Sequence, residues 1–267
     1  MTNFVLKPLT QLELREIFDD TAVETIEFYL KRSFFAQPEL VPGQNPLPIH
    51  VPKEHIEQWV VQAIGASPVG AGSYPVDVIK PGDFGADVKM LSCKVSPLGQ
   101  LTNGDSGETS LAQKFQEAGN ELDQLFASQD YETIVHGWTS ILKSKLERVL
   151  ENDSVSNIYY LFILRAHTKF YLCGLKVDVA NLDNICVLRG TNSSVFIDRF
   201  IDSRYGNTKI YKAKKRLELR LKPKYWVENN LVIPFEFDRP TTPVSIRQLI
   251  SEGRLEEYQD QIIREIF

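Results

Sequence analysis

The segment from Tyr74 to Leu91 constrains the fold of this chain most, because it contains two apolar runs separated by a tight-turn sequence. The runs are Pro75–Ile79 and Ala86–Leu91, and Pro81-Gly82 lies between them. Proline presets the backbone for the second position of a type II turn, and glycine supplies the positive φ that follows. We therefore predict two antiparallel strands joined as a hairpin.

This predicted hairpin brings two carboxylates together. Asp77 precedes Gly82 by five residues and Asp87 follows it by five, so the two side chains stand opposite each other. Cross-strand Cβ atoms are typically about 4.5–5.5 Å apart. Lys89 is two residues beyond Asp87, and alternation of side chains along a strand places both on the same face. Two carboxylates and an amine on one patch suit a divalent metal and an attacking water.

The pattern resembles the PD-(D/E)XK nuclease superfamily, and type II restriction endonucleases in particular. In that family an Asp near the start of one strand is followed by Asp/Glu-X-Lys on the next. Here these elements are Pro75-Val76-Asp77 and Asp87-Val88-Lys89, with an extra Val between Pro75 and Asp77 as the one departure. The resemblance implies an α/β (α+β) fold, in which helices flank a central mixed β-sheet.

The resemblance also implies a reaction, the Mg²⁺-dependent cleavage of double-stranded DNA to 5′-phosphate and 3′-hydroxyl ends. Asp77 and Asp87 would bind the metal, and Lys89 would orient the attacking water or offset charge on the phosphate. The alternative is a hairpin with ordinary surface charges. Two facing carboxylates repel unless a cation lies between them, and Lys89 alone among the lysines has an acidic residue two positions earlier.

Three further acidic residues are candidates for the same site. In many relatives a Glu from the preceding helix completes the metal site, which here points to Glu54 and Glu57 in the helical-looking segment from Lys53. Either can equally be a solvated helix residue. Asp83 lies four residues before Asp87, but Asp is common in turns, and we expect it to serve the turn.

Charge is distributed unevenly along the chain. The net charge is −5, yet the segment from Arg204 to Lys224 has nine basic residues and one acidic residue, and the remainder carries −13. Such segregation suits a protein that contacts phosphates with one face only.

Within that segment, Ile210–Lys222 alternates polar and apolar residues with period 2, which predicts one strand with a cationic face. This face could follow DNA phosphates and present an Arg to guanine edges, or it could be an edge strand protected by its lysines. Polar residues expected in neighbouring loops, including Arg189 and Asn207, are further candidates for base contacts. The candidate nucleic-acid contacts are Lys212, Lys214, Arg216, Arg220, Asn103 and Asn192.

The rest of the chain alternates helical and β-like patterns. Apolar spacing and capping-box sequences predict helices over 10–36 (with a capping box at Thr21–Glu24), from about 53 to 64, from Ser110 through Phe126, and from about 131 to 151. Strands are predicted at 157–165 and 169–178, and C-terminal helices run from Thr242-Pro243 with a break at Gly253. This order fits the αβββαβ core that the resemblance implies.

We expect a single nuclease domain over residues 1–267. It would comprise an N-terminal helical extension to about 52, a catalytic core at 53–180, and DNA-recognition and C-terminal elements at 181–267. The apolar stripes of the C-terminal helices predict burial against the core or, alternatively, a two-fold homodimer suited to palindromic DNA. The resemblance further implies a cognate DNA methyltransferase that acts on the same site without a stable complex.

Other features concern location and competing functions. No apolar run approaches the length of a membrane span, no secretory signal is evident, and the three cysteines are scattered. We therefore expect a cytoplasmic, prokaryotic protein with no membrane contact. Two alternatives stay open: a structure-specific or repair nuclease without sequence readout, and a non-catalytic DNA-binding protein.

Overall fold

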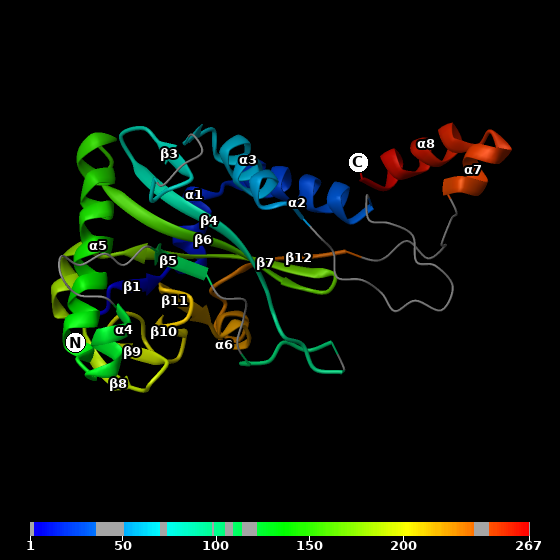
Figure 1. The fold of residues 1–267 in the computed structure, drawn as a ribbon. Coiled ribbons are helices and arrows are strands. Elements are labelled where there is room, and N and C mark those ends of the chain that lie inside the picture. The colour runs from blue at the N-terminus through cyan, green and yellow to red at the C-terminus, as the bar shows by residue number, and fades with distance from the viewer. Residues whose placement is uncertain are drawn as a thin grey trace.

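The computed structural model describes residues 3–35, 51–69, 74–97, 99–104, 109–113, 122–237 and 246–266. These residues form a mixed α/β fold with two sheets, and helices flank the first, larger sheet (Figure 1). That sheet has the order β1-β7-β6-β4-β3-β2, with β12 also paired to β7. It is mixed because β4 and β6 are parallel, whereas its other pairs are antiparallel.

The strands of the first sheet are β1 (Leu6–Pro8), β2 (Ser67–Pro68), β3 (Val78–Lys80), β4 (Phe84–Ser92), β6 (Asn157–Ala166), β7 (Lys169–Val177) and β12 (Ile233–Glu236). The second sheet has the order β5-β11-β10-β9-β8. Its strands are β5 (Thr109–Gln113), β8 (Cys186–Gly190), β9 (Ser194–Asp198), β10 (Gly206–Tyr211) and β11 (Arg216–Leu221). The first sheet thus takes β1 from the expected N-terminal extension and β12 from the expected C-terminal elements.

The helices are α1 (Gln11–Ile17), α2 (Asp20–Phe35), α3 (Lys53–Ile64), α4 (Leu122–Ala127), α5 (Tyr131–Asn152), α6 (Pro223–Glu228), α7 (Ile246–Glu252) and α8 (Leu255–Ile266), with a 3₁₀ turn η1 (Val179–Asn184). Figure 1 shows α5 beside both sheets and the α7–α8 pair at the α2 end of the molecule.

One apolar core joins α5 to both sheets. Trp138 and Leu142 of α5 are buried together with Phe162 and Leu175 of the first sheet and Leu219 of the second. Helix α5 also connects the parallel strands β4 and β6. The long apolar stripe of α5 and the continuous apolar runs of β6 and β7 explain this burial, because each element contributes a full face to the core.

A second core covers the opposite face of the first sheet, where α1, α2 and α3 pack. Val60 of α3 is buried there together with Val88 of β4. Because side chains alternate along a strand, the neighbours of Val88, Asp87 and Lys89, point to the α5 side. Leu91 follows the same alternation and lies in the α5 core. The fold therefore places the two polar residues of β4 on the face shared with α5.

The predicted hairpin is confirmed. Gly82 has φ of +74°, and the Asp83 N–H donates to the Lys80 carbonyl over 3.0 Å, as in a type II turn. Strands β3 and β4 pair with Val78 opposite Ala86, so the turn is centred on the predicted position. The predictions of α3, α5, β6, β7 and the break at Gly253 are also confirmed, whereas the start at Thr242 lies outside the described residues.

The helical prediction over residues 10–36 is confirmed for α1 and α2, but the predicted position of the capping box is wrong. The capping box is at Thr10 and Glu13 rather than at Thr21, and α1 ends before Phe18. Helix α2 then restarts at Asp20, with the Asp19 carboxylate accepting from the Ala22 N–H over 2.8 Å. The Asp19 carboxylate thus accepts a hydrogen bond from one of the free N–H groups at the start of α2. The apolar periodicity could not reveal this second helix start.

The helix predicted to begin at Ser110 is wrong as well. Residues Thr109–Gln113 form β5, which pairs antiparallel with β11 at the edge of the second sheet. Among the described residues that follow β5, the first helix is α4, which begins at Leu122. Pairing with a strand about a hundred residues away overrides the local capping pattern, as tertiary context often does.

The single strand predicted over Ile210–Lys222 is in fact a hairpin. Strands β10 and β11 pair antiparallel, and residues 212–215 form the turn between them. Lys215 has φ of +45°, and its N–H donates to the Lys212 carbonyl over 3.1 Å. The predicted alternation holds only within β11, because Lys212 and Lys214 of the predicted cationic face lie in the turn. Tyr211, expected on the apolar face, instead stands opposite Arg216.

Candidate active site

The β3–β4 hairpin brings two carboxylates, Asp77 and Asp87, to the same ammonium group. The regular β3–β4 pairing ends with Val78 opposite Ala86, and the Asp77 N–H donates to the same Ala86 carbonyl over 2.9 Å, so Asp77 is held at the end of the ladder. The Asp77 carboxylate also accepts from the Val88 N–H over 2.9 Å. The backbone of β4 therefore fixes the Asp77 side chain in addition to the ladder itself.

Lys89 joins both carboxylates. Its Nζ lies 2.7 Å from Asp77 Oδ2 and 2.6 Å from Asp87 Oδ1, and it also donates to the Val88 carbonyl over 3.1 Å. The three charged side chains are only 14–19% exposed. The structure thus brings together the three residues that the sequence singled out, although the regular β3–β4 pairing ends at Val78, one residue short of the expected pair of Asp77 with Asp87.

Burial and mutual charge perturb the acid–base behaviour of the three groups. Burial raises the pKa of Asp87 to about 7, with the Asp77 charge adding to it and Lys89 opposing it. Burial also raises the pKa of Asp77, but Lys89 and the Val88 N–H outweigh it, and the net pKa lies below the ordinary value. Burial lowers the pKa of Lys89, yet the two carboxylates raise it overall. Such opposed shifts in neighbouring groups are common at functional sites.

Tyr160 is a neighbour that the sequence did not reveal. It stands beside Asp87 in the parallel pairing of β4 and β6, and it is 3% exposed. Burial raises the pKa of its phenol, and the Asp87 charge raises it further. From the sequence, Tyr160 is one residue of the continuous apolar run of β6 and is expected only to be buried in the core. Its position beside Asp87 depends on the parallel register of β4 and β6, which cannot be derived from one sequence.

The chemistry of the donors fits Mg²⁺. Magnesium is typically held by one or two carboxylates together with waters and substrate phosphate. Asp77 and Asp87 supply hard oxygen ligands. The Lys89 ammonium lies between the two carboxylates, so the structure already has a positive charge at the position that a metal ion would take. Among the residues that the structure describes, no group of three or more carboxylate, imidazole or thiolate side chains that could hold a metal is found. The site therefore offers two protein carboxylates.

The further acidic candidates occupy other positions. Asp83 is exposed in the turn, where its carbonyl accepts from the N–H groups of Ser156 and Asn157. Glu57 lies on α3, a helix whose buried residues pack on the opposite face of the first sheet. The side chain of Glu54 lies outside the part of the chain that the structure describes.

The four basic candidates for nucleic-acid contacts lie on the β10–β11 hairpin, and three of them are within ion-pair distance of carboxylates. Lys214 and Arg216 lie 3.5 and 3.2 Å from Glu218, which is 1% exposed. Lys212 lies 3.7 Å from Asp123 of α4. Arg220 pairs across the ladder with Asn207. The exposed cationic face expected from the sequence is thus partly neutralised by two acidic residues.

The two asparagine candidates differ in their surroundings. The Asn103 side-chain oxygen accepts from the Tyr225 N–H over 3.1 Å and so caps the start of α6. Asn192 is exposed in the turn between β8 and β9. The Lys212 N–H donates to the carbonyl of Ser193 over 3.0 Å, so this turn lies against the β10–β11 turn.

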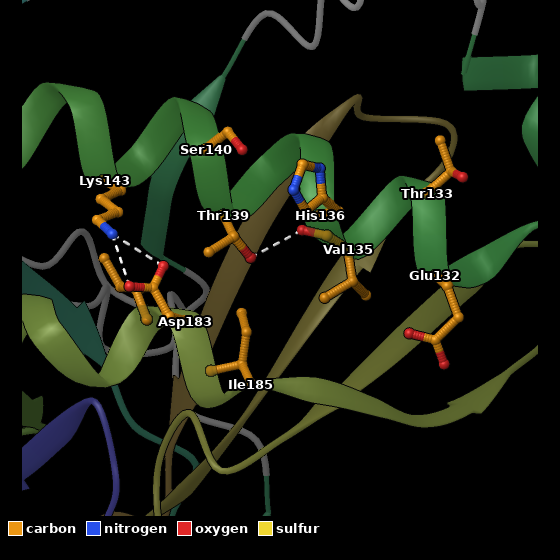
Figure 2. A pocket seen from close by; sticks show the side chains of 10 residues that line it. Glu132, Thr133, Val135, His136, Thr139, Ser140, Lys143, Asp183 and Ile185 are labelled. Atoms are coloured by element: carbon orange, nitrogen blue, oxygen red, sulfur yellow. Dashed lines mark hydrogen bonds and ion pairs between the residues drawn. The ribbon is translucent and has the colours of Figure 1, made fainter.

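A surface hollow of about 570 Å³ lies between α5 and η1, away from the β3–β4 hairpin. Figure 2 shows His136 and Thr139 of α5 beside it, and the Lys143–Asp183 ion pair at one end. Its lining residues are Glu132, Thr133, Val135, His136, Thr139, Ser140, Lys143, Leu182, Asp183 and Ile185. None of them belongs to β3 or β4, so the hollow is separate from the carboxylate site.

Comparisons of the chain with protein-family models, with curated proteins and with solved structures found no match. In the described residues, no helix combines the length and the apolar character that crossing a bilayer requires.

Proposed function

We propose that this chain is a Mg²⁺-dependent, site-specific endonuclease of double-stranded DNA, most like a type II restriction enzyme with a PD-(D/E)XK core. The observation that carries the proposal is the convergence of Asp77, Asp87 and Lys89 on one strand hairpin. The element order α3, β3–β4, α5 and β6, with β6 parallel to β4, is in keeping with the core that the sequence resemblance implies.

Each residue then has a defined part in phosphodiester hydrolysis. Asp77 and Asp87 would hold Mg²⁺, which when bound polarises the scissile phosphate and lowers the pKa of a water. Lys89, displaced from between the carboxylates, would orient the attacking water or offset negative charge on the phosphate oxygens. The water oxygen bonds to phosphorus, the bond to the 3′-oxygen breaks, and the water proton passes to solvent while the 3′-oxygen acquires a proton. The products carry 5′-phosphate and 3′-hydroxyl ends.

The biological setting follows from the same proposal. A site-specific nuclease of this class would act in a prokaryotic cytoplasm, as a homodimer on a palindromic site. A cognate DNA methyltransferase would protect that site without a stable complex.

The competing function is a non-catalytic DNA-binding protein in which the cluster is a structural ion-pair network. One observation favours it, namely that Lys89 already satisfies both carboxylates. Incubation of the purified chain with plasmid of known sequence, in Mg²⁺ and in EDTA, separates the possibilities. Discrete fragments that form in Mg²⁺ but not in EDTA support site-specific cleavage. A smear in Mg²⁺ indicates a nuclease without sequence readout. Plasmid that stays intact under both conditions supports the non-catalytic function.

A further inference from the structure

The second sheet has one face in the core and one face turned outward. Val195, Ile210 and Leu219 are fully buried in the core shared with α5. Their neighbours along the strands, Phe196 and Lys209 among them, are only partly buried. We call the side away from this core the outer face; its central residues are Arg189, Phe196, Lys209, Tyr211, Arg216, Arg220 and Glu218, of which Glu218 is buried.

The strand register assembles these residues into a row across four strands. Arg189 of β8 stands opposite Phe196 of β9, and Phe196 stands opposite Lys209 of β10. Lys209 in turn stands opposite Glu218 of β11, and Tyr211 is two residues along β10 on the same side. Residues directly opposite in an antiparallel ladder share a face, so basic and aromatic side chains alternate across the sheet.

Aromatic rings support the cations of this row. The Arg189 guanidinium lies 4.1 Å from the centre of the Phe196 ring. The Lys209 ammonium lies 4.7 Å from the centre of the Tyr211 ring, and Lys214 lies 5.5 Å from the same ring. Attraction between a cation and a ring face restricts the side chain without neutralising its charge.

The ion pairs described for the acidic residues of the outer face involve cations other than Arg189 and Lys209. Glu218 lies within ion-pair distance of Arg216 and Lys214, and Asp198 lies beside Cys186. Within the described part of the chain, neither Arg189 nor Lys209 forms an ion pair with a carboxylate. The sequence pointed to Arg189 only as a further candidate for base contacts, and to Lys209 only as part of the basic segment Arg204–Lys224.

We infer that the outer face binds the phosphate backbone of duplex DNA, with Arg189 and Lys209 contacting phosphates while Phe196 and Tyr211 hold them in position. The identity of the partner rests on the proposed function, whereas the surface is defined by the structure alone. Fixed cations that keep their charge suit phosphate, because less side-chain entropy is lost on binding.

The same geometry argues against a stacking platform for single strands. Such platforms offer free aromatic faces to successive bases. On the outer face, Arg189 covers the Phe196 ring, and Lys209 and Lys214 lie over the Tyr211 ring. Bases would have to displace these cations, so we expect duplexes to bind at least as tightly as single strands of equal length.

The inference is tested by binding of the full chain to a fluorescent duplex in EDTA, measured by anisotropy at several salt concentrations. Arg189→Ala and Lys209→Ala should each weaken binding about fivefold at 0.1 M salt and make the salt dependence shallower by about one phosphate contact. Lys176→Ala removes an exposed cation from β7 of the first sheet and serves as the matched control, with affinity unchanged. Unaltered near-ultraviolet circular dichroism verifies that each variant is folded.

The aromatic residues provide the sharper test, because replacing them changes no charge. Phe196→Leu should weaken duplex binding about two- to fivefold in the wild-type chain and have no effect when Arg189 is already Ala. Tyr211→Leu should behave likewise in a chain in which both Lys209 and Lys214, the two cations over its ring, are already Ala. An unchanged affinity in Phe196→Leu, or a duplex affinity in the Arg189→Ala/Lys209→Ala variant equal to that of the wild type, would overturn the inference.

The outcome also separates this inference from the proposed nuclease activity. Binding is measured without metal, so a chain that binds duplex through the outer face but never cleaves it would sustain the inference and refute the nuclease. DNA cleavage by a chain whose duplex affinity is unchanged in the Arg189→Ala and Lys209→Ala variants would support the nuclease and refute the inference. Binding to vesicles of anionic phospholipid in place of duplex DNA would overturn the inference in favour of a membrane surface.

Discussion

The Lys89 ammonium lies 2.7 Å from the Asp77 carboxylate although the two residues are twelve positions apart in the chain. The turn at Pro81-Gly82 and the register of β3 with β4 create this contact. Because the same ammonium also lies 2.6 Å from Asp87, one cation is shared by two carboxylates. A bound Mg²⁺ would compete with Lys89 for these oxygens, and this competition leads to measurable consequences.

Replacement of Lys89 by Ala leaves Asp77 and Asp87 close together without their counter-charge. We expect the free energy of unfolding in EDTA at pH 8 to fall by about 2–4 kcal/mol, because loss of one partner from a mostly buried ion pair is costly. Mg²⁺ should restore more stability to this variant than it adds to the wild type. Urea unfolding with and without Mg²⁺ measures both effects.

The matched control is Lys143→Ala, which breaks a more exposed ion pair with Asp183. We expect it to cost at most about 1 kcal/mol and to show no additional response to Mg²⁺. Equal responses of the two variants to Mg²⁺ would contradict a cation site at Asp77 and Asp87.

The stability of the metal-free protein should fall as pH rises through neutrality. Burial raises the pKa of Asp87 from 3.8 to about 7, so this carboxyl holds its proton to a higher pH in the folded chain than in the unfolded chain. Its contribution is therefore complete below the unfolded pKa and is lost as pH rises through the folded one. Unfolding free energies in EDTA between about pH 5 and pH 8 should show this fall.

Asp87→Asn mimics the protonated carboxyl and should remove that part of the pH dependence. In the wild type, Mg²⁺ should stabilise more strongly at pH 8 than at pH 6, because binding requires an ionised carboxylate. A Mg²⁺ effect that does not vary with pH would count against Asp87 as a ligand.

DNA binding should survive the loss of the Asp87 charge. We expect Asp87→Asn to bind duplex DNA in EDTA as tightly as the wild type or up to about threefold more tightly, since one negative charge near the phosphate is removed. Fluorescence anisotropy checks this. Asp183→Asn, which removes a carboxylate beside α5, is the control and should leave the affinity unchanged. Loss of binding in Asp87→Asn alone would show that the residue supports structure rather than cleavage.

The shared core predicts that α5 holds both sheets together. Leu142→Ala should lower the free energy of unfolding by about 2–5 kcal/mol, because Leu142 is 1% exposed in that core. Leu12→Ala, at a side chain that is 73% exposed on α1, should change it by less than about 0.5 kcal/mol. Thermal or urea unfolding of the pair tests the assignment, and similar losses would contradict it.

The sequence was sufficient for those parts of the fold that depend on local rules. Pro81 and Gly82 determine a turn through their backbone preferences, and alternation from that turn places Asp77, Asp87 and Lys89 on one face. The apolar patterns of α5, β6 and β7 were equally clear, because each extends over two or more turns or along a whole buried strand.

The parts that the sequence did not reveal depend on distant partners. Ser110 begins a capping-box pattern, yet β11 supplies a strand for Thr109–Gln113 to pair with. Glu218 appears as one acid in a basic segment, but it is buried and contacts Arg216 and Lys214. Neither the parallel neighbour Tyr160 nor the ring beneath Arg189 can be derived from spacing, because strand order decides both.

The most direct measurement is cleavage of duplex DNA in Mg²⁺ by the wild type beside Asp77→Asn, Asp87→Asn and Lys89→Ala, with ends mapped after the reaction. Loss of a metal ligand or of the assisting ammonium should slow cleavage at least about 100-fold. We predict 5′-phosphate ends from the wild type, none above background from the three variants, and no cleavage in EDTA. Cleavage by all three variants at the wild-type rate, or by none of the four proteins, would contradict a hydrolytic centre at these residues.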